Sequence, residues 1–199
     1  MRTTLSITLA LLLVACDTEL PVVDDAGPPD GGFPGRCGAL TCSEEGVCVE
    51  DAPTKGARVN GIWGTGPSNV FLVGEGGMVL RFDGQAWKAM SSGVSVTLYD
   101  VWGAGPNDVH AVGSAGTALR FDGKSWKAAA SGTKAALRGL WGSGPSRIFA
   151  VGGDGKTSVG LRFDGKAWSA VAALARDRVT LLDVHGDGTK RAAAVGYYY

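Results

Sequence analysis

The sequence has few of the side chains on which acid–base and metal chemistry depend. It contains two histidines and four cysteines among 199 residues. It also has no phosphate-binding loop, dinucleotide fingerprint, nucleophile elbow, His-Glu zinc motif or calcium loop. We therefore expect a protein that is not an enzyme, with no catalytic residue, no metal site and no cofactor.

Long apolar runs and an excess of one charge are lacking as well. The N-terminal apolar run from Leu5 to Ala15 is eleven residues long, whereas a membrane-spanning helix needs about 20. Basic and acidic side chains number 19 each, so the chain has no strong basic field for nucleic acid. The sequence thus argues against a multi-span membrane protein and against a nucleic-acid partner.

The balanced total hides two regions of opposite charge. Residues 17–56 hold nine acids and two bases, whereas residues 57–199 hold 16 bases and 10 acids. Hydrophobic residues make up 45% of the chain, which is enough to bury a core. The division predicts an acidic N-terminal segment followed by one folded domain.

Residues 1–15, MRTTLSITLALLLVA, have the layout of a secretory signal peptide, with an early cation, an apolar run and small residues at its end. The sequence Leu13-Val14-Ala15-Cys16 resembles the lipobox of bacterial lipoproteins. This resemblance implies that Cys16 becomes the mature N-terminus and carries diacylglycerol and, usually, an amide-linked acyl chain. Several acyl chains anchor a protein stably. We therefore expect a lipid-anchored, extracytoplasmic protein of the cell envelope, at the inner or the outer membrane.

Residues 16–56 begin with a stretch rich in Pro, Gly and acids that has no sustained helical or strand period. This composition predicts a flexible tether. The second half of the segment contains Cys37, Cys42 and Cys48. Outside the cytoplasm, two of these thiols should form a disulfide, without the sequence saying which two. The alternatives are an intermolecular bond through the odd thiol and a metal site, although this cysteine spacing is unusual for zinc.

The rest of the chain, residues 57–199, is a repeat with a period of 39 residues. Residues 62–93 align without gaps on residues 101–132, and a third copy starts at Leu140 with three extra residues. A fourth copy begins at Val184 and stops halfway. The period is close to the ~40–50 residues of propeller blades.

Each complete copy holds four short apolar stretches separated by turn residues, among them an Asp-Gly hairpin signal. In the second copy these stretches are Leu98 to Trp102, Val109 to Val112, Ala118 to Phe121 and Trp126 to Ala129. The pattern predicts an all-β, β-propeller-like array of four-stranded blades with about three and a half repeats. A parallel β-solenoid is the structural alternative.

The recurring Trp-Gly and Asp-Gly-x-x-Trp motifs resemble a repeat family of bacterial β-propellers that is common in predicted lipoproteins of Gram-negative bacteria. They are also similar to the Asp-box of sialidase-type propellers. However, the motif at Asp83-Gly84-x-x-Trp87 is one residue shorter than an Asp-box. This difference argues against glycosidase chemistry.

The repeat alignment assigns structural roles to most polar and aromatic residues. His110 aligns with Phe71 and Phe149, and His185 aligns with a recurring tryptophan, so both histidines are interpreted as aromatic fillers. The recurring aspartates follow Phe in each Phe-Asp-Gly turn, where a short carboxylate can accept backbone N–H groups. The six tryptophans occur two per complete copy, which predicts packing between blades. The recurring aspartates of the Phe-Asp-Gly turns are Asp83, Asp122 and Asp164.

Arginine recurs within Leu-Arg-Phe at Arg81, Arg120 and Arg162. Strand alternation places these side chains opposite the apolar Leu and Phe. One interpretation is a solvated face or pairing with nearby acids. The other is an anion-binding row of guanidinium groups that binds carboxylate or phosphate on an anionic surface polymer.

We expect a non-catalytic binding or scaffolding protein whose partners are the membrane, through the lipid, and an envelope polysaccharide or protein. The alternatives are a glycan-acting hydrolase on a propeller scaffold and a truncated, inactive propeller fragment. Because the fourth copy stops after two strands, open blade edges should lead to self-association. The repeat domain is therefore expected to complete its ring with a second chain or to be marginally stable.

Overall fold

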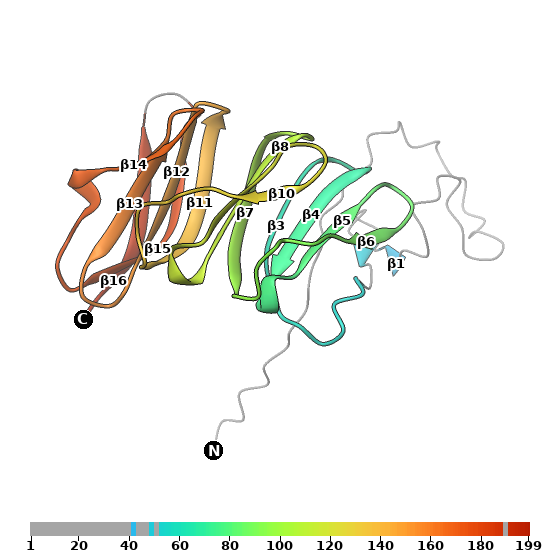
Figure 1. Ribbon diagram of the computed structural model, residues 1–199, viewed down its shortest axis with the longest axis horizontal. Helices are drawn as coiled ribbons and strands as arrows, with labels where there is room; N and C mark the ends of the chain where they lie inside the picture. The colour runs from blue at the N-terminus through green and yellow to red at the C-terminus, as the bar shows by residue number, and fades with distance from the viewer. Residues whose placement is uncertain (1–40, 43–47, 50–51, 189–190) are drawn as a thin grey trace, which may run out of the picture.

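The structure, a computed structural model, describes residues 41–42, 48–49, 52–188 and 191–199. The expected signal peptide, Cys16 and Cys37 lie outside the described residues. The described part consists of β-strands with three single-turn 3₁₀ helices (Figure 1). These helices are η1 (Glu75–Gly77), η2 (Ser114–Gly116) and η3 (Ala172–Leu174).

Three four-stranded antiparallel sheets, or blades, follow one another along the chain. The first blade consists of β3 (Val59–Gly66), β4 (Asn69–Gly74), β5 (Val79–Phe82) and β6 (Trp87–Ala89). The second consists of β7 (Leu98–Gly105), β8 (Asp108–Gly113), β9 (Ala118–Phe121) and β10 (Trp126–Ala128). The third consists of β11 (Ala136–Gly144), β12 (Arg147–Gly153), β13 (Ser158–Phe163) and β14 (Trp168–Ala170).

Two two-stranded sheets complete the described part of the chain. The fourth blade has only β15 (Val179–Gly186) and β16 (Ala192–Tyr198). A short pair, β1 (Thr41–Cys42) and β2 (Cys48–Val49), precedes the first blade. The expected array of three and a half four-stranded blades is therefore confirmed.

The turn chemistry of the repeat explains the strand boundaries. Each of the four apolar stretches expected in the second copy forms one strand, β7 to β10. In the turn between β9 and β10, Asp122 Oδ1 accepts the backbone N–H groups of Lys124 and Ser125 at 3.0 and 2.9 Å. Asp83 and Asp164 make the equivalent pairs of bonds. The predicted turn role of these three aspartates is confirmed.

Three of the four buried clusters join consecutive blades, and the fourth consists of residues of the first blade. The inner strands β3, β7, β11 and β15 pack side by side in chain order, so the blades form an arc (Figure 1). Trp126 of the second blade joins a buried cluster with Phe71 of the first, and their ring centroids are 6.0 Å apart. The predicted packing of tryptophan between blades is confirmed at this junction. Apolar contacts between blades are expected to supply most of the stability.

Within the described residues, no helix is long and apolar enough to cross a membrane.

Candidate functional site

One edge of the arc carries the two kinds of hairpin turn that recur in every complete blade. The turn between the first and second strands contacts the turn between the third and fourth. In the first blade, a Cβ atom added to Gly84 would lie 2.8 Å from Ser68 Cβ, and Gly123 contacts Asn107 in the same way in the second. The stacked turns of the three blades therefore form one continuous edge.

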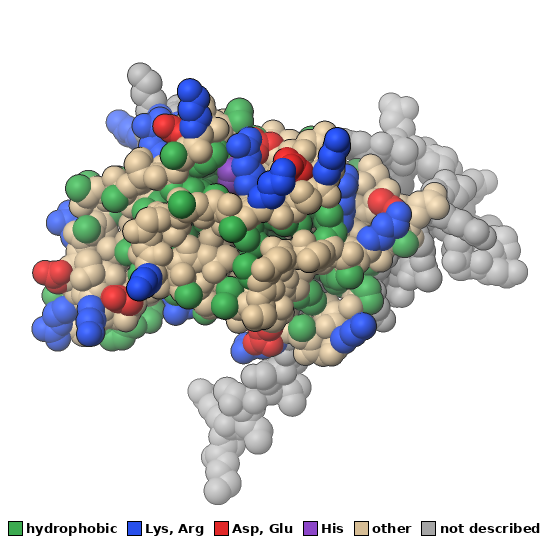
Figure 2. Space-filling model, in the orientation of Figure 1, with side chains coloured by type: hydrophobic (Ala, Val, Ile, Leu, Met, Phe, Trp, Pro, Cys, Tyr) green, Lys and Arg blue, Asp and Glu red, His purple; other side chains and the backbone are tan. Residues whose placement is uncertain are grey.

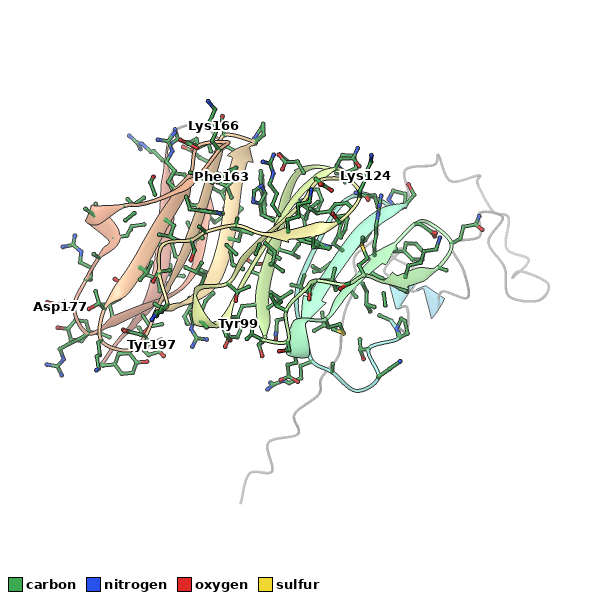
Figure 3. All side chains as sticks on the ribbon, viewed as in Figure 1. Tyr99, Lys124, Phe163, Lys166, Asp177 and Tyr197 are labelled. Atoms are coloured by element: carbon green, nitrogen blue, oxygen red, sulfur yellow. The ribbon has the colours of Figure 1, made fainter. Side chains whose placement is uncertain are left out.

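Basic side chains gather at this edge, which we call the cationic edge. Figure 2 shows Lys and Arg side chains along it, and Figure 3 places Lys124 and Lys166 there, opposite Tyr99 and Tyr197. Eight basic and four acidic residues belong to the cationic edge, so its net charge is positive. The basic residues are Arg81, Lys88, Arg120, Lys124, Lys127, Arg147, Arg162 and Lys166, and the acidic residues are Asp83, Asp108, Asp122 and Asp164.

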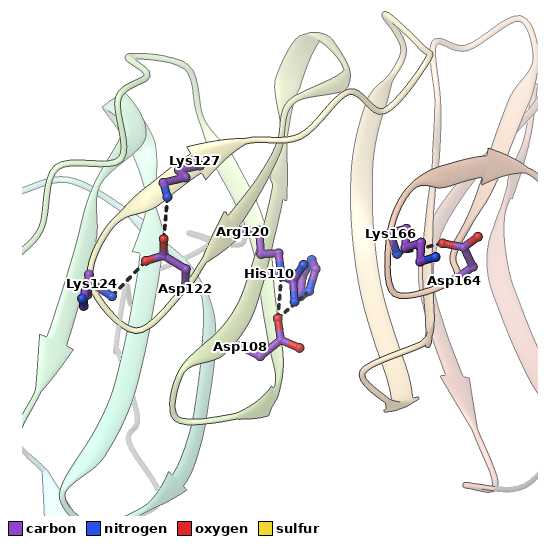
Figure 4. A network of polar contacts seen from close by, with 8 residues as sticks. All are labelled: Asp108, His110, Arg120, Asp122, Lys124, Lys127, Asp164 and Lys166. Carbon is purple, nitrogen blue, oxygen red and sulfur yellow. Dashed lines mark hydrogen bonds and ion pairs between the residues drawn. The ribbon is translucent and has the colours of Figure 1, made fainter.

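Some of these charges already have partners. Lys127 Nζ lies 2.6 Å from Asp122 Oδ2 (Figure 4), and Lys88 Nζ lies 2.5 Å from Asp83 Oδ2. The bond from Lys127, together with the backbone N–H groups of the turn, holds the pKa of Asp122 well below its usual range. Both pairs are exposed and therefore contribute little to stability.

Two of the three recurring arginines lie in the seams between blades. Arg81 Nε donates to Asn69 Oδ1 at 3.1 Å, and the guanidinium lies 5.7 Å from the ring centroid of Phe121 in the second blade. Arg120 Nε donates to Asp108 Oδ1 at 2.7 Å and lies 5.6 Å from the ring of Phe163 in the third blade. Cation–π contacts of this kind are worth about 0.5–2 kcal/mol. Arg120 therefore pairs with a nearby acid, as one of the two interpretations of the sequence expected.

Besides the ion-paired Lys88 and Lys127, the exposed cations of the cationic edge are Lys124, Arg162 and Lys166. Within the described residues, none of these three side chains forms an ion pair. The sequence pattern had singled out Arg162 but not the two lysines. Their signal was present in the repeat alignment, because both lysines follow Asp-Gly in the same column. An anion-binding row of Arg81, Arg120 and Arg162 stays a prediction, with Arg162 the most accessible of the three.

His110 fills the aromatic position that the alignment assigned to it. The ring is 1% exposed and lies 4.9 Å from the ring of Phe163. Its Nε2 lies 3.3 Å from Asp108 Oδ1 (Figure 4), but neither ring nitrogen forms a hydrogen bond. Burial lowers the pKa of His110 to about 4, with the nearby Arg120 acting in the same direction and Asp108 opposing them.

We expect His110→Phe to stabilise the protein, because two buried and unbonded ring nitrogens are removed. Since the folded-state pKa lies below the unfolded value of about 6.5, protonation favours unfolding. The parent should lose stability as the pH falls from about 6.5 to 4, by about 3 kcal/mol, and the variant should not. Urea unfolding at a series of pH values measures this difference.

The reciprocal change Phe71→His, at the equivalent buried position, should introduce the same sensitivity to acid. Burial also raises the pKa of Asp100 to about 6, so the Asp100 contribution falls as the pH rises from about 4 to 6. This opposite slope is common to parent and variants and cancels in their difference. Parallel pH curves for the parent and His110→Phe would contradict the assignment.

The cysteine-containing segment is described only at β1 and β2. Cys42 stands directly opposite Cys48 in this antiparallel pair. Directly opposed residues have Cα atoms about 4.5–5.5 Å apart, within the range of about 4.4–6.8 Å found in disulfides. A disulfide among Cys37, Cys42 and Cys48 stays a prediction.

Similarity to known proteins is limited to structure. No family model and no curated protein matches the chain. Among solved structures, the chain is similar to YCF48 from Cyanidioschyzon merolae, a β-propeller, with a TM-score of 0.56 and 11% sequence identity, over 71% of this chain and 48% of that one. A structure titled "YCF48 bound to D1 peptide" has a TM-score of 0.38 and 16% identity, over 70% of this chain and 61% of that one.

The chain has a β-propeller-type fold. Three complete antiparallel blades and the similarity to YCF48 agree on this point. The similarity spans about half the length of that protein. At 11% identity it shows the fold and not the activity.

Proposed function

We propose that this protein is a non-catalytic, lipid-anchored binding protein of the bacterial cell envelope, and that its cationic edge binds an anionic envelope polysaccharide. The observation that carries the proposal is the set of exposed and unpaired cations, Lys124, Arg162 and Lys166, on one edge of the second and third blades. Guanidinium and ammonium groups bind carboxylate and phosphate oxygens.

The resemblance of Leu13-Val14-Ala15-Cys16 to a lipobox supports the anchor. An anchor at the start of residues 16–56 would hold the blades at the membrane surface, where polysaccharide is available as a ligand. The turn contacts of the recurring aspartates support a non-catalytic role, because those contacts account for Asp83, Asp122 and Asp164 without any reaction. A protein partner with an acidic surface is the alternative ligand that the binding test must distinguish.

The structure refines which residues the test should change. Arg81 and Arg120 stack on rings of the following blade, so their replacement would disturb the blade seams as well as any ligand. We expect the triple change Lys124→Gln, Arg162→Gln and Lys166→Gln to weaken binding to immobilised lipopolysaccharide about tenfold, at ~0.5 kcal/mol for each exposed charge. The loss should shrink as salt is added, because screening weakens the charge term in both proteins.

The matched control removes three exposed cations from the opposite edge, Lys134→Gln, Lys156→Gln and Arg176→Gln. This control has the same net charge as the test variant and should bind like the parent. An equal loss in both variants, or equal binding of the parent to uncharged dextran, would contradict the proposal. If the parent does not bind lipopolysaccharide but binds an acidic envelope protein, the ligand is a protein and not a polysaccharide.

A further inference from the structure

Each inner strand contains a β-bulge at the same place in its blade. Near the start of β3, β7, β11 and β15, the pairing register with the following strand shifts by one residue. The extra residue of a bulge has no partner in the ladder, and the local bend redirects its side chain. The residues at the four bulges are Asn60, Tyr99, Arg138 and Leu182.

The four bulge residues differ from one another, although their neighbours in the repeat are alike. The residue before the bulge is aliphatic in every blade, as Val59, Leu98, Leu137 and Leu181. The blade structure therefore fixes the position of the bulge and not the side chain that it carries. Because a bulge redirects a side chain, bulges are frequent next to active sites.

The bulges of consecutive blades lie next to one another. Asn60 Nδ2 donates to the carbonyl oxygen of the residue before Tyr99 at 2.8 Å. The Arg138 guanidinium lies 5.1 Å from the ring centroid of Tyr99. A Cβ atom added to the glycine after Arg138 would lie 3.0 Å from the carbonyl oxygen of Leu182. The four bulge residues therefore form one row across the blades, which we call the bulge row.

Arg138 is a fixed cation at the middle of the bulge row. The Tyr99 ring beneath it is held in place, because Ser114 Oγ donates to the Tyr99 hydroxyl at 3.0 Å. Within the described residues, Arg138 Nε has no hydrogen-bond acceptor, and the guanidinium forms no ion pair. The carboxylate of the neighbouring Asp100 already accepts two backbone N–H groups. Arg138 can therefore accept an anion from outside the described chain.

Two exposed tyrosine rings lie near this cation. Tyr197 is 42% exposed and Tyr199 is 50% exposed, and their hydroxyl oxygens are 2.6 Å apart. Figure 3 places Tyr197 at the same edge of the arc as Tyr99. The hydrogen bond with Tyr197 lowers the pKa of Tyr199, and the positive charge of Arg138 acts in the same direction. A cation and two open aromatic rings thus lie within reach of one small ligand.

We propose that the bulge row and the Tyr197–Tyr199 pair bind a uronic acid, which is a sugar ring that carries a carboxylate. The carboxylate would accept two N–H groups from the planar guanidinium of Arg138. The C–H face of the sugar ring would pack on the Tyr197 ring, because tyrosine combines an apolar face with a polar hydroxyl. The sugar hydroxyls would bond to the hydroxyls of Tyr197 and Tyr199.

The combination of groups selects this ligand class. A simple carboxylate would use the guanidinium and leave the rings exposed, whereas a neutral sugar would use the rings and leave the cation without an anion. The inference does not rest on the proposed function, because Tyr99 and Tyr197 lie at the edge opposite Lys124 and Lys166 (Figure 3).

Binding of methyl β-D-glucuronide to the full chain in mild detergent, followed by ligand-observed NMR, tests the site. The glucuronide should bind about tenfold more tightly than methyl β-D-glucoside, which has the same ring without the carboxylate, because a charge-assisted bidentate contact is lost. Arg138→Gln should abolish this preference. The matched control Arg178→Gln removes an exposed cation that lies 5.8 Å from the ring of Tyr198, and it should keep the preference.

A second variant keeps the test decisive if Arg138→Gln does not fold. Tyr197 is exposed, so Tyr197→Ser should fold, and it should weaken both sugars to a similar degree because the stacking surface serves both. The triple variant of Lys124, Arg162 and Lys166 should bind the glucuronide like the parent, whether or not it binds lipopolysaccharide. Equal binding of the two sugars by the parent, binding of acetate as tight as that of the glucuronide, or an equal loss in Arg178→Gln would each overturn the proposal.

Discussion

Replacing Cys16 with serine should abolish the incorporation of labelled palmitate and leave an unprocessed precursor. A serine hydroxyl cannot form the thioether that the resemblance to a lipobox implies for Cys16. The apolar run from Leu5 to Ala15 would then remain attached, and its eleven residues are too few to span a bilayer. Metabolic labelling followed by electrophoresis of immunoprecipitated protein measures both the label and the size of the product.

Cys37→Ser is the matched control, because it removes one thiol from the same N-terminal segment without touching the motif. It should keep full label and normal processing. Equal label in the parent and in Cys16→Ser would rule out acylation at this residue. The envelope location would then lose its main support, whereas the propeller fold would stand.

The fold could be predicted because the chain is compared with itself. Because the sequence repeats every 39 residues, residues that recur in every copy can be distinguished from residues that occur in one copy only. The recurring residues are those that the blade structure requires. His110 shows the strength of this comparison: its column holds Phe71 and Phe149, and the ring lies buried against Phe163 of the next blade. The Asp-Gly turns could be predicted equally well, since their hydrogen bonds join residues that are close in sequence.

Contacts between blades could not be predicted in the same way. The Arg81 guanidinium lies over two rings, Phe71 of its own blade and Phe121, which is 40 positions further on in the next blade. Its Nε donates to Asn69, which belongs to a different alignment column. Recurrence identified Arg81 as a repeated residue without revealing that it belongs to a seam. One alignment column also alternates between Gly and Asp along the blades, as Gly61, Asp100, Gly139 and Asp183. This pattern repeats every two blades, so a comparison that looks for identical residues in each copy does not detect it.

The largest loss of stability is expected from Gly116→Ala. Gly116 has a φ of +69°, and a Cβ atom there would lie 2.0 Å from the carbonyl oxygen of Thr133, in the segment that leads to the third blade. The left-handed backbone costs an L-residue about 1–2 kcal/mol, and moving a packed backbone to relieve the overlap adds about 1–3 kcal/mol. Together these effects take a large share of the ~5–15 kcal/mol that holds a typical domain folded. Equilibrium urea unfolding, followed by tryptophan fluorescence, should show a clearly lower midpoint.

Gly132→Ala separates the two causes. Gly132 has a nearly identical φ of +75°, but no atom lies within 4 Å of its added Cβ, so this variant should lose only the backbone contribution of about 1 kcal/mol. The first blade provides an independent copy of the comparison. Gly77 has a φ of +73° and an added Cβ 2.0 Å from the Val94 carbonyl oxygen, whereas Gly93 has a φ of +75° and open space. If all four alanine variants unfolded at the same urea concentration, the segments entering the second and third blades would not pack against these turns, and the stacking of blades would need a different explanation.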